Sequence, residues 1–99
     1  MNIAFSSGKL ARCYENSREA QRAWGQAIAK KYVMRVDTLY KAQNFDELFL
    51  LPALRLHPLK GVRSGAFSMT LQGKWRLIIT ATEDRRSIVV EEVSNHYDD

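Results

Sequence analysis

The spacing of apolar residues changes about halfway along the chain. Up to about residue 43 they recur every three or four positions, which is typical of amphipathic helices. From about residue 54 onward, apolar and polar residues alternate, which is typical of strands with one buried face. The pattern predicts a short strand at 3–5, helices at 16–24 and 26–43, and then an antiparallel sheet of about four strands.

Two features predict where the first of these helices begins and ends. Asn16 precedes Glu19 by three positions, the spacing of a capping box in which both side chains bind backbone N–H groups. Gly25 falls where the apolar stripe changes phase, and glycine enters the left-handed region without steric cost. We therefore expect two helices rather than one long rod.

Polar turns divide the second half of the chain into strands. A tight turn is predicted at 72–73 and another at 84–86, and the continuous apolar run at 88–90 is typical of a central strand. The order of elements predicts an α+β fold in a single domain over residues 1–99. Two helices would cover one face of the sheet, and the other face would remain open.

Strand alternation predicts which side chains reach the open face. Arg55 and His57 are two positions apart, so a strand there would place both on the same face. Arg76 follows Trp75, so the arginine would lie on the open face and the tryptophan in the core against the helices. Glu91 and Glu92 are adjacent and would point to opposite faces, which argues against a joint catalytic role.

The distribution of charge suggests what the open face could bind. The chain of 99 residues has a formal net charge of +4, but residues 48–82 hold five Lys or Arg and no Asp or Glu. Clustered cations attract phosphate backbones, so nucleic-acid contact is one interpretation, and a merely solvated sheet face is the other.

Other features of the composition limit the classes of protein to consider. The single Cys13 cannot form an internal disulfide and is expected to be a small buried residue. The sequence has no Cys/His cluster of the kind that binds metal, no apolar run near the ~20 residues of a membrane span, and nothing like a signal peptide. We expect a cytoplasmic protein with no metal, no cofactor and no membrane association.

Two stretches of sequence resemble a known family. Residues 56–65 read LHPLKGVRSG and residues 75–79 read WRLII. They resemble the RelE/ParE toxin superfamily and, within it, the HigB-type killer proteins of bacterial type II toxin–antitoxin systems. The resemblance extends over nearly the whole chain and implies a RelE-like fold.

The resemblance also implies a function. These toxins include ribosome-dependent mRNA endoribonucleases that inhibit translation and cleave without a metal, through attack of the RNA 2′-hydroxyl. The implied partners are the ribosome with its mRNA and a cognate helix-turn-helix antitoxin of the HigA type. Operator DNA would be bound only through the antitoxin complex.

Four residues suit the chemistry of metal-free RNA cleavage. The 2′-hydroxyl must lose a proton, the 5′-oxygen must gain one, and a dianionic phosphorane must be stabilised. Arg63 and Arg76 suit the last task because a guanidinium forks onto two phosphate oxygens. Lys60 could support the same charge or act as a base. Histidine titrates near neutrality, so His57 could be acid or base, or a structural imidazole beside Pro58.

The C-terminus and two further cations complete the candidate site. HigB-type proteins commonly end the last strand with Asp-Tyr-His; here His96 matches the histidine, but Ser94 and Asn95 replace the other two. Tyr97 could stack on a base from one position later, or the tail could be frayed. Arg55 and Lys74 are the remaining predicted RNA-binding residues.

Two alternative functions remain at this point. A ParE-like inhibitor of DNA gyrase would need no acid–base residues, and a catalytically weak member could persist as an antitoxin-binding and operon-regulating module. His57, Lys60 and His96 together favour the nuclease, because a gyrase inhibitor has no use for them. The irregular ending at 94–96 keeps the inactive module open.

Overall fold

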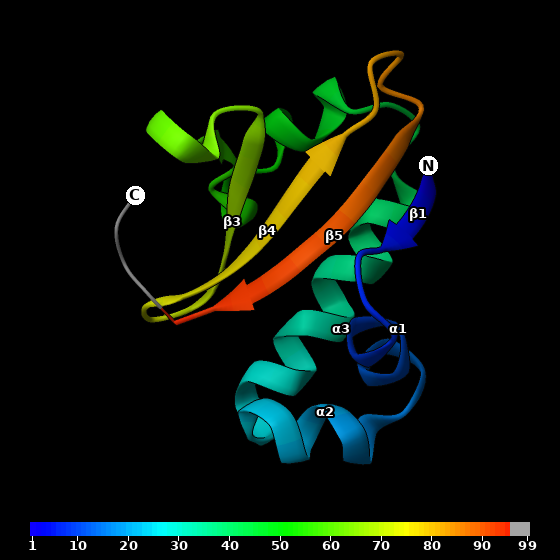
Figure 1. The fold of residues 1–99 in the computed structure, drawn as a ribbon, viewed down its shortest axis with the longest axis vertical. Helices are drawn as coiled ribbons and strands as arrows, with labels where there is room; N and C mark the ends of the chain where they lie inside the picture. The colour runs from blue at the N-terminus through cyan, green and yellow to red at the C-terminus, as the bar shows by residue number, and fades with distance from the viewer. Residues whose placement is uncertain (96–99) are drawn as a thin grey trace.

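The computed structural model describes residues 1–95 as a mixed sheet with helices on one face (Figure 1). The α-helices and strands are β1 (Asn2–Phe5), α1 (Gly8–Glu15), α2 (Ser17–Trp24), α3 (Gln26–Lys41), β2 (His57–Pro58), β3 (Ala66–Gln72), β4 (Trp75–Ala81) and β5 (Ser87–Ser94). Three short 3-10 helices connect them: η1 (Asp46–Leu50), η2 (Pro52–Leu54) and η3 (Gly61–Arg63). The predicted α+β fold is confirmed.

The sheet differs from the prediction at one edge. Its strand order is β1-β5-β4-β3-β2, and β1 runs parallel to β5 while the other neighbours are antiparallel. The described residues therefore form five strands in a mixed sheet instead of about four antiparallel strands. The register pairs Ile3 with Ile88 and Phe5 with Val90, so the first strand extends the apolar surface of the last.

The two predicted helices are confirmed, and a third precedes them. Asn16 caps α2 by accepting hydrogen bonds from the backbone N–H groups of Arg18 and Glu19, at 3.0 and 3.4 Å. Gly25 separates α2 from α3 with φ 83° and ψ 166°. The additional helix α1 buries Leu10 and Cys13, which lie on one face of it three positions apart.

The core lies between the helices and one face of the sheet. Tyr32 on α3 is fully buried, and its hydroxyl donates a 2.7 Å hydrogen bond to the Leu10 carbonyl. Trp75 packs against this core, as predicted, and Cys13 is part of it. The Arg35 side chain ties α3 to the sheet because its Nε donates to the Thr70 carbonyl over 3.0 Å. The helices thus fix the position of β3 from behind.

The prediction of a strand through residues 54–57 is wrong. Pro52–Leu54 forms a 3-10 turn, and Arg55 follows it with the left-handed angles φ 51° and ψ 43°. Only His57 and Pro58 pair with β3, so Arg55 lies outside the strand and does not share a sheet face with His57. A proline at the start of the turn favours this geometry, and the left-handed residue then ends the alternation.

None of the helices within residues 1–95 is long and apolar enough to span a membrane.

We predict that Gly25→Ala destabilises the fold through backbone strain alone. A side chain is strongly disfavoured at φ 83° and ψ 166°, yet an added Cβ would meet no atom within 4 Å. The free energy of unfolding should fall by about 1–3 kcal/mol, measured by urea denaturation. A loss below about 0.5 kcal/mol would contradict this account of the junction, because surface substitutions commonly fall in that range.

We also predict that the bond between Tyr14 and Asp37 makes stability depend on pH in the alkaline range. The Tyr14 hydroxyl donates to Asp37 Oδ1 over 2.5 Å, and this bond, with burial, raises the pKa of Tyr14 to about 12. An unfolded tyrosine titrates near ~10, so the contribution is complete below that pH and is lost as pH rises toward the folded pKa.

Tyr14→Phe should cost about 1–2 kcal/mol of unfolding free energy at neutral pH and flatten the alkaline decline in urea titrations. Tyr40→Phe is the matched control, because Tyr40 stacks on Tyr14 at 5.6 Å between ring centroids. An equal loss in the control would show that removal of any hydroxyl from this aromatic cluster, and not loss of the bond to Asp37 in particular, lowers the stability.

Candidate functional site

The strand register brings several predicted site residues to the sheet face opposite the helices. His57 pairs with Ser68, Ser68 with Ile78, and Ile78 with Glu92, so these four residues form one row across β2, β3, β4 and β5. Directly paired residues project from the same face of a sheet. Met69 and Leu77, which alternate with them, belong to the core.

Arg76 belongs to the next row on this face. It pairs with Thr70 on β3 and with Ser94 on β5. We call the face that carries both rows the site face, defined by His57, Ser68, Thr70, Arg76, Ile78, Glu92 and Ser94. Arg76 and Ile78 are two positions apart on β4, so the rows lie about 7 Å from each other.

The Arg76 guanidinium is held by the turn between β3 and β4. Its Nη1 donates to the carbonyl oxygens of Gly73 and Trp75, at 2.6 and 3.0 Å, and lies 3.5 Å from Thr70 Oγ1. These contacts fix a half-buried cation at one end of the site face. Lys74, in the same turn, is exposed.

Arg63 reaches the site face from the loop between β2 and β3. Its Nη2 donates to Glu92 Oε1 on β5, and the side chains of the two residues are 34% and 46% exposed. Because β3 and β4 lie between that loop and β5 in the strand order, the loop and the Arg63 side chain together cross the face. A half-exposed ion pair of this kind contributes only about 0–1 kcal/mol to stability.

His57 lies at the opposite edge of the same row as Glu92. Its Nδ1 is 3.0 Å from the Arg55 carbonyl oxygen, which can only accept a hydrogen bond. This contact assigns the proton of the neutral ring to Nδ1 and makes Nε2 the basic atom. Arg55 therefore meets the site through its backbone, while its side chain is exposed.

The remaining predicted residues are less closely placed. Lys60 is exposed, immediately precedes η3 and lies outside the two rows. His96 and Tyr97 lie outside the described residues. His57, Arg63 and Arg76 are thus the predicted residues that share one face of the sheet.

Sequence reasoning missed the position of two carboxylates. Ile78 pairs with Glu92 but Ile79 pairs with Val90, so β5 contains one extra residue, Glu91. Glu91 accepts a 2.7 Å hydrogen bond from Thr80, which lies two positions from Ile78 and so on the site face.

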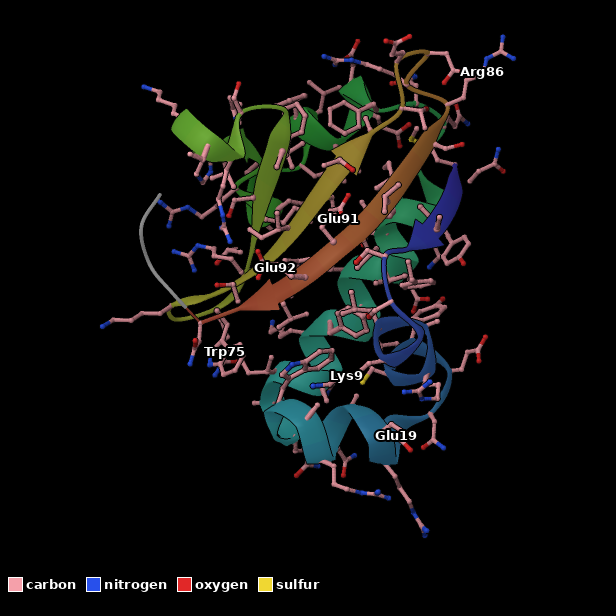
Figure 2. All side chains as sticks on the ribbon, viewed as in Figure 1. Lys9, Glu19, Trp75, Arg86, Glu91 and Glu92 are labelled. Atoms are coloured by element: carbon pink, nitrogen blue, oxygen red, sulfur yellow. The ribbon has the colours of Figure 1, made fainter. Side chains whose placement is uncertain are left out.

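The prediction that these two carboxylates point to opposite faces is wrong because a β-bulge interrupts the alternation. Figure 2 shows Glu91 and Glu92 along the sheet, with Trp75 toward one end and Arg86 at the other. The sequence does carry a signal. The core positions Ile88 and Val90 are two apart, but the next residue packed on the core is Val93, three further on.

The site face carries mixed charge and is only partly exposed, because Ser68, Ile78 and Ser94 on it are buried. Two hollows of about 340 and 320 Å³ lie elsewhere, one lined in part by Phe45 and Arg85 and the other between α2 and α3. Within residues 1–95, no three His, Cys, Asp or Glu side chains are grouped so that they could hold a metal ion. A partly exposed row of guanidinium, imidazole and carboxylate groups suits an extended anionic chain better than an enclosed small molecule.

Comparison with known proteins shows which solved structures share this fold. No protein-family model matches the chain, and no curated protein matches it in sequence. Solved structures do match. The YoeB–YefM complex from Staphylococcus aureus aligns with a TM-score of 0.62 and 18% identity, over 98% of each chain.

Two further solved structures align over nearly the whole chain. The YoeB/ParE toxin from Agrobacterium tumefaciens gives a TM-score of 0.60 and 16% identity, over 98% of this chain and 100% of the other. YafQ from E. coli gives 0.56 and 19%, over 94% and 90%. The predicted resemblance is confirmed at the level of fold: the chain has the fold of the RelE/ParE-type toxins.

Proposed function

We propose that this protein is the toxin of a type II toxin–antitoxin system and cleaves mRNA on the ribosome. The observation that carries the proposal is the placement of His57, Arg63 and Arg76 on the sheet face opposite the helices of a RelE/ParE-type fold. A gyrase-binding surface would not require an imidazole in register with a guanidinium-binding carboxylate. The cleavage needs no metal, because the substrate supplies its own nucleophile.

The reaction follows from the chemistry of these side chains. The 2′-oxygen attacks the adjacent phosphorus, the bond from phosphorus to the 5′-oxygen breaks, and the products are a 2′,3′-cyclic phosphate and a 5′-hydroxyl. His57 is proposed to move a proton at Nε2, either from the 2′-hydroxyl or to the 5′-oxygen. Arg63 and Arg76 stabilise the additional negative charge on the phosphorane oxygens.

The other cations are proposed to bind the RNA on either side of the scissile bond. Lys60 is exposed in the loop between β2 and β3 and Lys74 in the turn between β3 and β4, where each could neutralise a backbone phosphate. Arg55 is exposed beside His57 and could do the same. His96 and Tyr97 keep their proposed roles as an acid–base residue and a stacking ring.

The proposed partners follow from the same resemblance. YoeB of S. aureus forms a complex with YefM, and we propose that this chain likewise binds a cognate antitoxin, of the HigA helix-turn-helix type. Operator DNA would be bound through that complex. The ribosome would orient the mRNA on the site face. The protein would act in the cytoplasm.

We predict that induction of this protein in cells produces cuts at defined codons within translated frames, detected by mapping the 5′ ends of transcripts. His57→Ala and Arg76→Ala should each lower the cleavage rate by about 100-fold or more, as losses of acid–base and charge-stabilising groups do. Arg86→Ala is the matched control, because it removes the same charge from an exposed turn at the other end of the sheet (Figure 2).

Each other outcome would replace the proposal with a specific alternative. Intact messages with accumulated DNA breaks would identify a gyrase inhibitor. No effect on growth from well-expressed, folded protein would identify an antitoxin-binding and operon-regulating module. Equal loss in the Arg86→Ala variant would show that total charge, and not the site face, determines activity.

A further inference from the structure

The β-bulge in β5 determines which residues face the site. Val90 points into the core, so regular alternation would return Glu92 to the core side. The extra residue Glu91 shifts the phase by one position. As a result Val93 packs on the core, and Glu92 and Ser94 lie on the site face beside Ile78 and Arg76. Bulges commonly redirect a side chain in this way.

Glu92, which the bulge turns to the site face, binds the guanidinium of Arg63, a residue whose backbone lies in a loop. Arg63 lies in the three-residue turn η3, where the Ser64 N–H donates to the Gly61 carbonyl over 3.0 Å and the Leu59 N–H donates to the Ala66 carbonyl over 2.9 Å. The ion pair with Glu92 adds a contact across the sheet. Because a half-exposed pair contributes little to stability, its main consequence is the location of the guanidinium.

The Arg63 guanidinium lies at the row that contains His57. Glu92 is in register with Ile78 and Ser68, and through them with His57. Glu92 therefore anchors the Arg63 guanidinium over the row at whose other edge the imidazole lies. A guanidinium has five N–H donors, so a bond from Nη2 to Glu92 is compatible with donation to a phosphate from the remaining groups.

We propose that Glu92 is a positioning residue that holds the Arg63 guanidinium where it binds the scissile phosphate. The inference rests on the proposed function and adds a residue to it. Glu91 offers a matched comparison, because it is the adjacent carboxylate on the same face but accepts its hydrogen bond from Thr80. Removal of either carboxylate changes the charge equally, whereas only Glu92 is bonded to Arg63.

The first experiment measures binding and is independent of cleavage. The probe is a short 2′-O-methyl RNA oligonucleotide, which lacks the nucleophile, and its Kd is measured for the wild type, Arg63→Ala, Glu92→Ala and the double variant. Arg63→Ala should weaken binding about tenfold when Glu92 is present and less than about threefold when it is replaced, as expected for coupled residues. Thermal melting verifies that every variant is folded.

The second experiment separates orientation from charge in the cleavage reaction on programmed ribosomes. Glu92→Ala should lower kcat about tenfold or more. The KM of this variant should change no more than the KM of Glu91→Gln, a variant that only alters the charge. Glu91→Gln should retain kcat within about twofold. Glu92→Gln, which can still accept a hydrogen bond from Arg63, should recover part of the loss.

Specific results would overturn the inference. An Arg63→Ala effect of the same size with and without Glu92 would show that Glu92 does not position the guanidinium. A rise in kcat or a larger Arg63→Ala effect in the Glu92→Ala background would show that Glu92 competes with phosphate. If the wild type binds the oligonucleotide but does not cleave, the proposed function fails and the binding cycle still decides the role of Glu92.

Discussion

The register between β4 and β5 is the constraint on which the rest of the structure depends. One face of these strands must supply Leu77, Ile79 and Val90 to the core, and the other must present Arg76. One extra residue in β5, Glu91, shifts the alternation, so that the core residues stay on one face and the site residues on the other along the whole of β4 and β5. Without it, the carboxylate bonded to Arg63 would lie against the helices, where an unpaired charge is strongly disfavoured.

The helical layer supports this sheet from one side, and the site face lies on the other. α3 contacts β3 and β1, and Arg35 binds the backbone of β3 directly behind the row that contains Thr70 and Arg76. The glycine junction at Gly25 and the bond from Tyr14 to Asp37 fix how the helices meet. Rigid strands backed by a packed core place side chains more accurately than loops do, which suits a site assembled across four strands.

The sequence was informative where structure is local. The Asn16 cap, the break at Gly25 and the inward position of Trp75 all follow from short-range chemistry, and the structure confirms them. The predicted turn at 72–73 lies one position later, at Gly73 and Lys74. The parallel pairing of β1 depends on residues more than 80 positions away in the chain, as between Ile3 and Ile88.

Two further features were missed because each interrupts a regular pattern. The left-handed Arg55 ends an apparent alternation, and the bulge at Glu91 shifts one. The cationic cluster was therefore visible in the sequence, but its pairing with an acidic residue was not. The central claim is that His57, Arg63 and Arg76 form one RNA-binding surface. Its most direct test is NMR of the protein with a 2′-O-methyl RNA oligonucleotide. The account predicts that the side-chain signals of these three residues shift together, with one affinity, while that of Arg86 does not. Shifts confined to the groove between α2 and α3 or to Arg86, with those three signals unchanged, would contradict it.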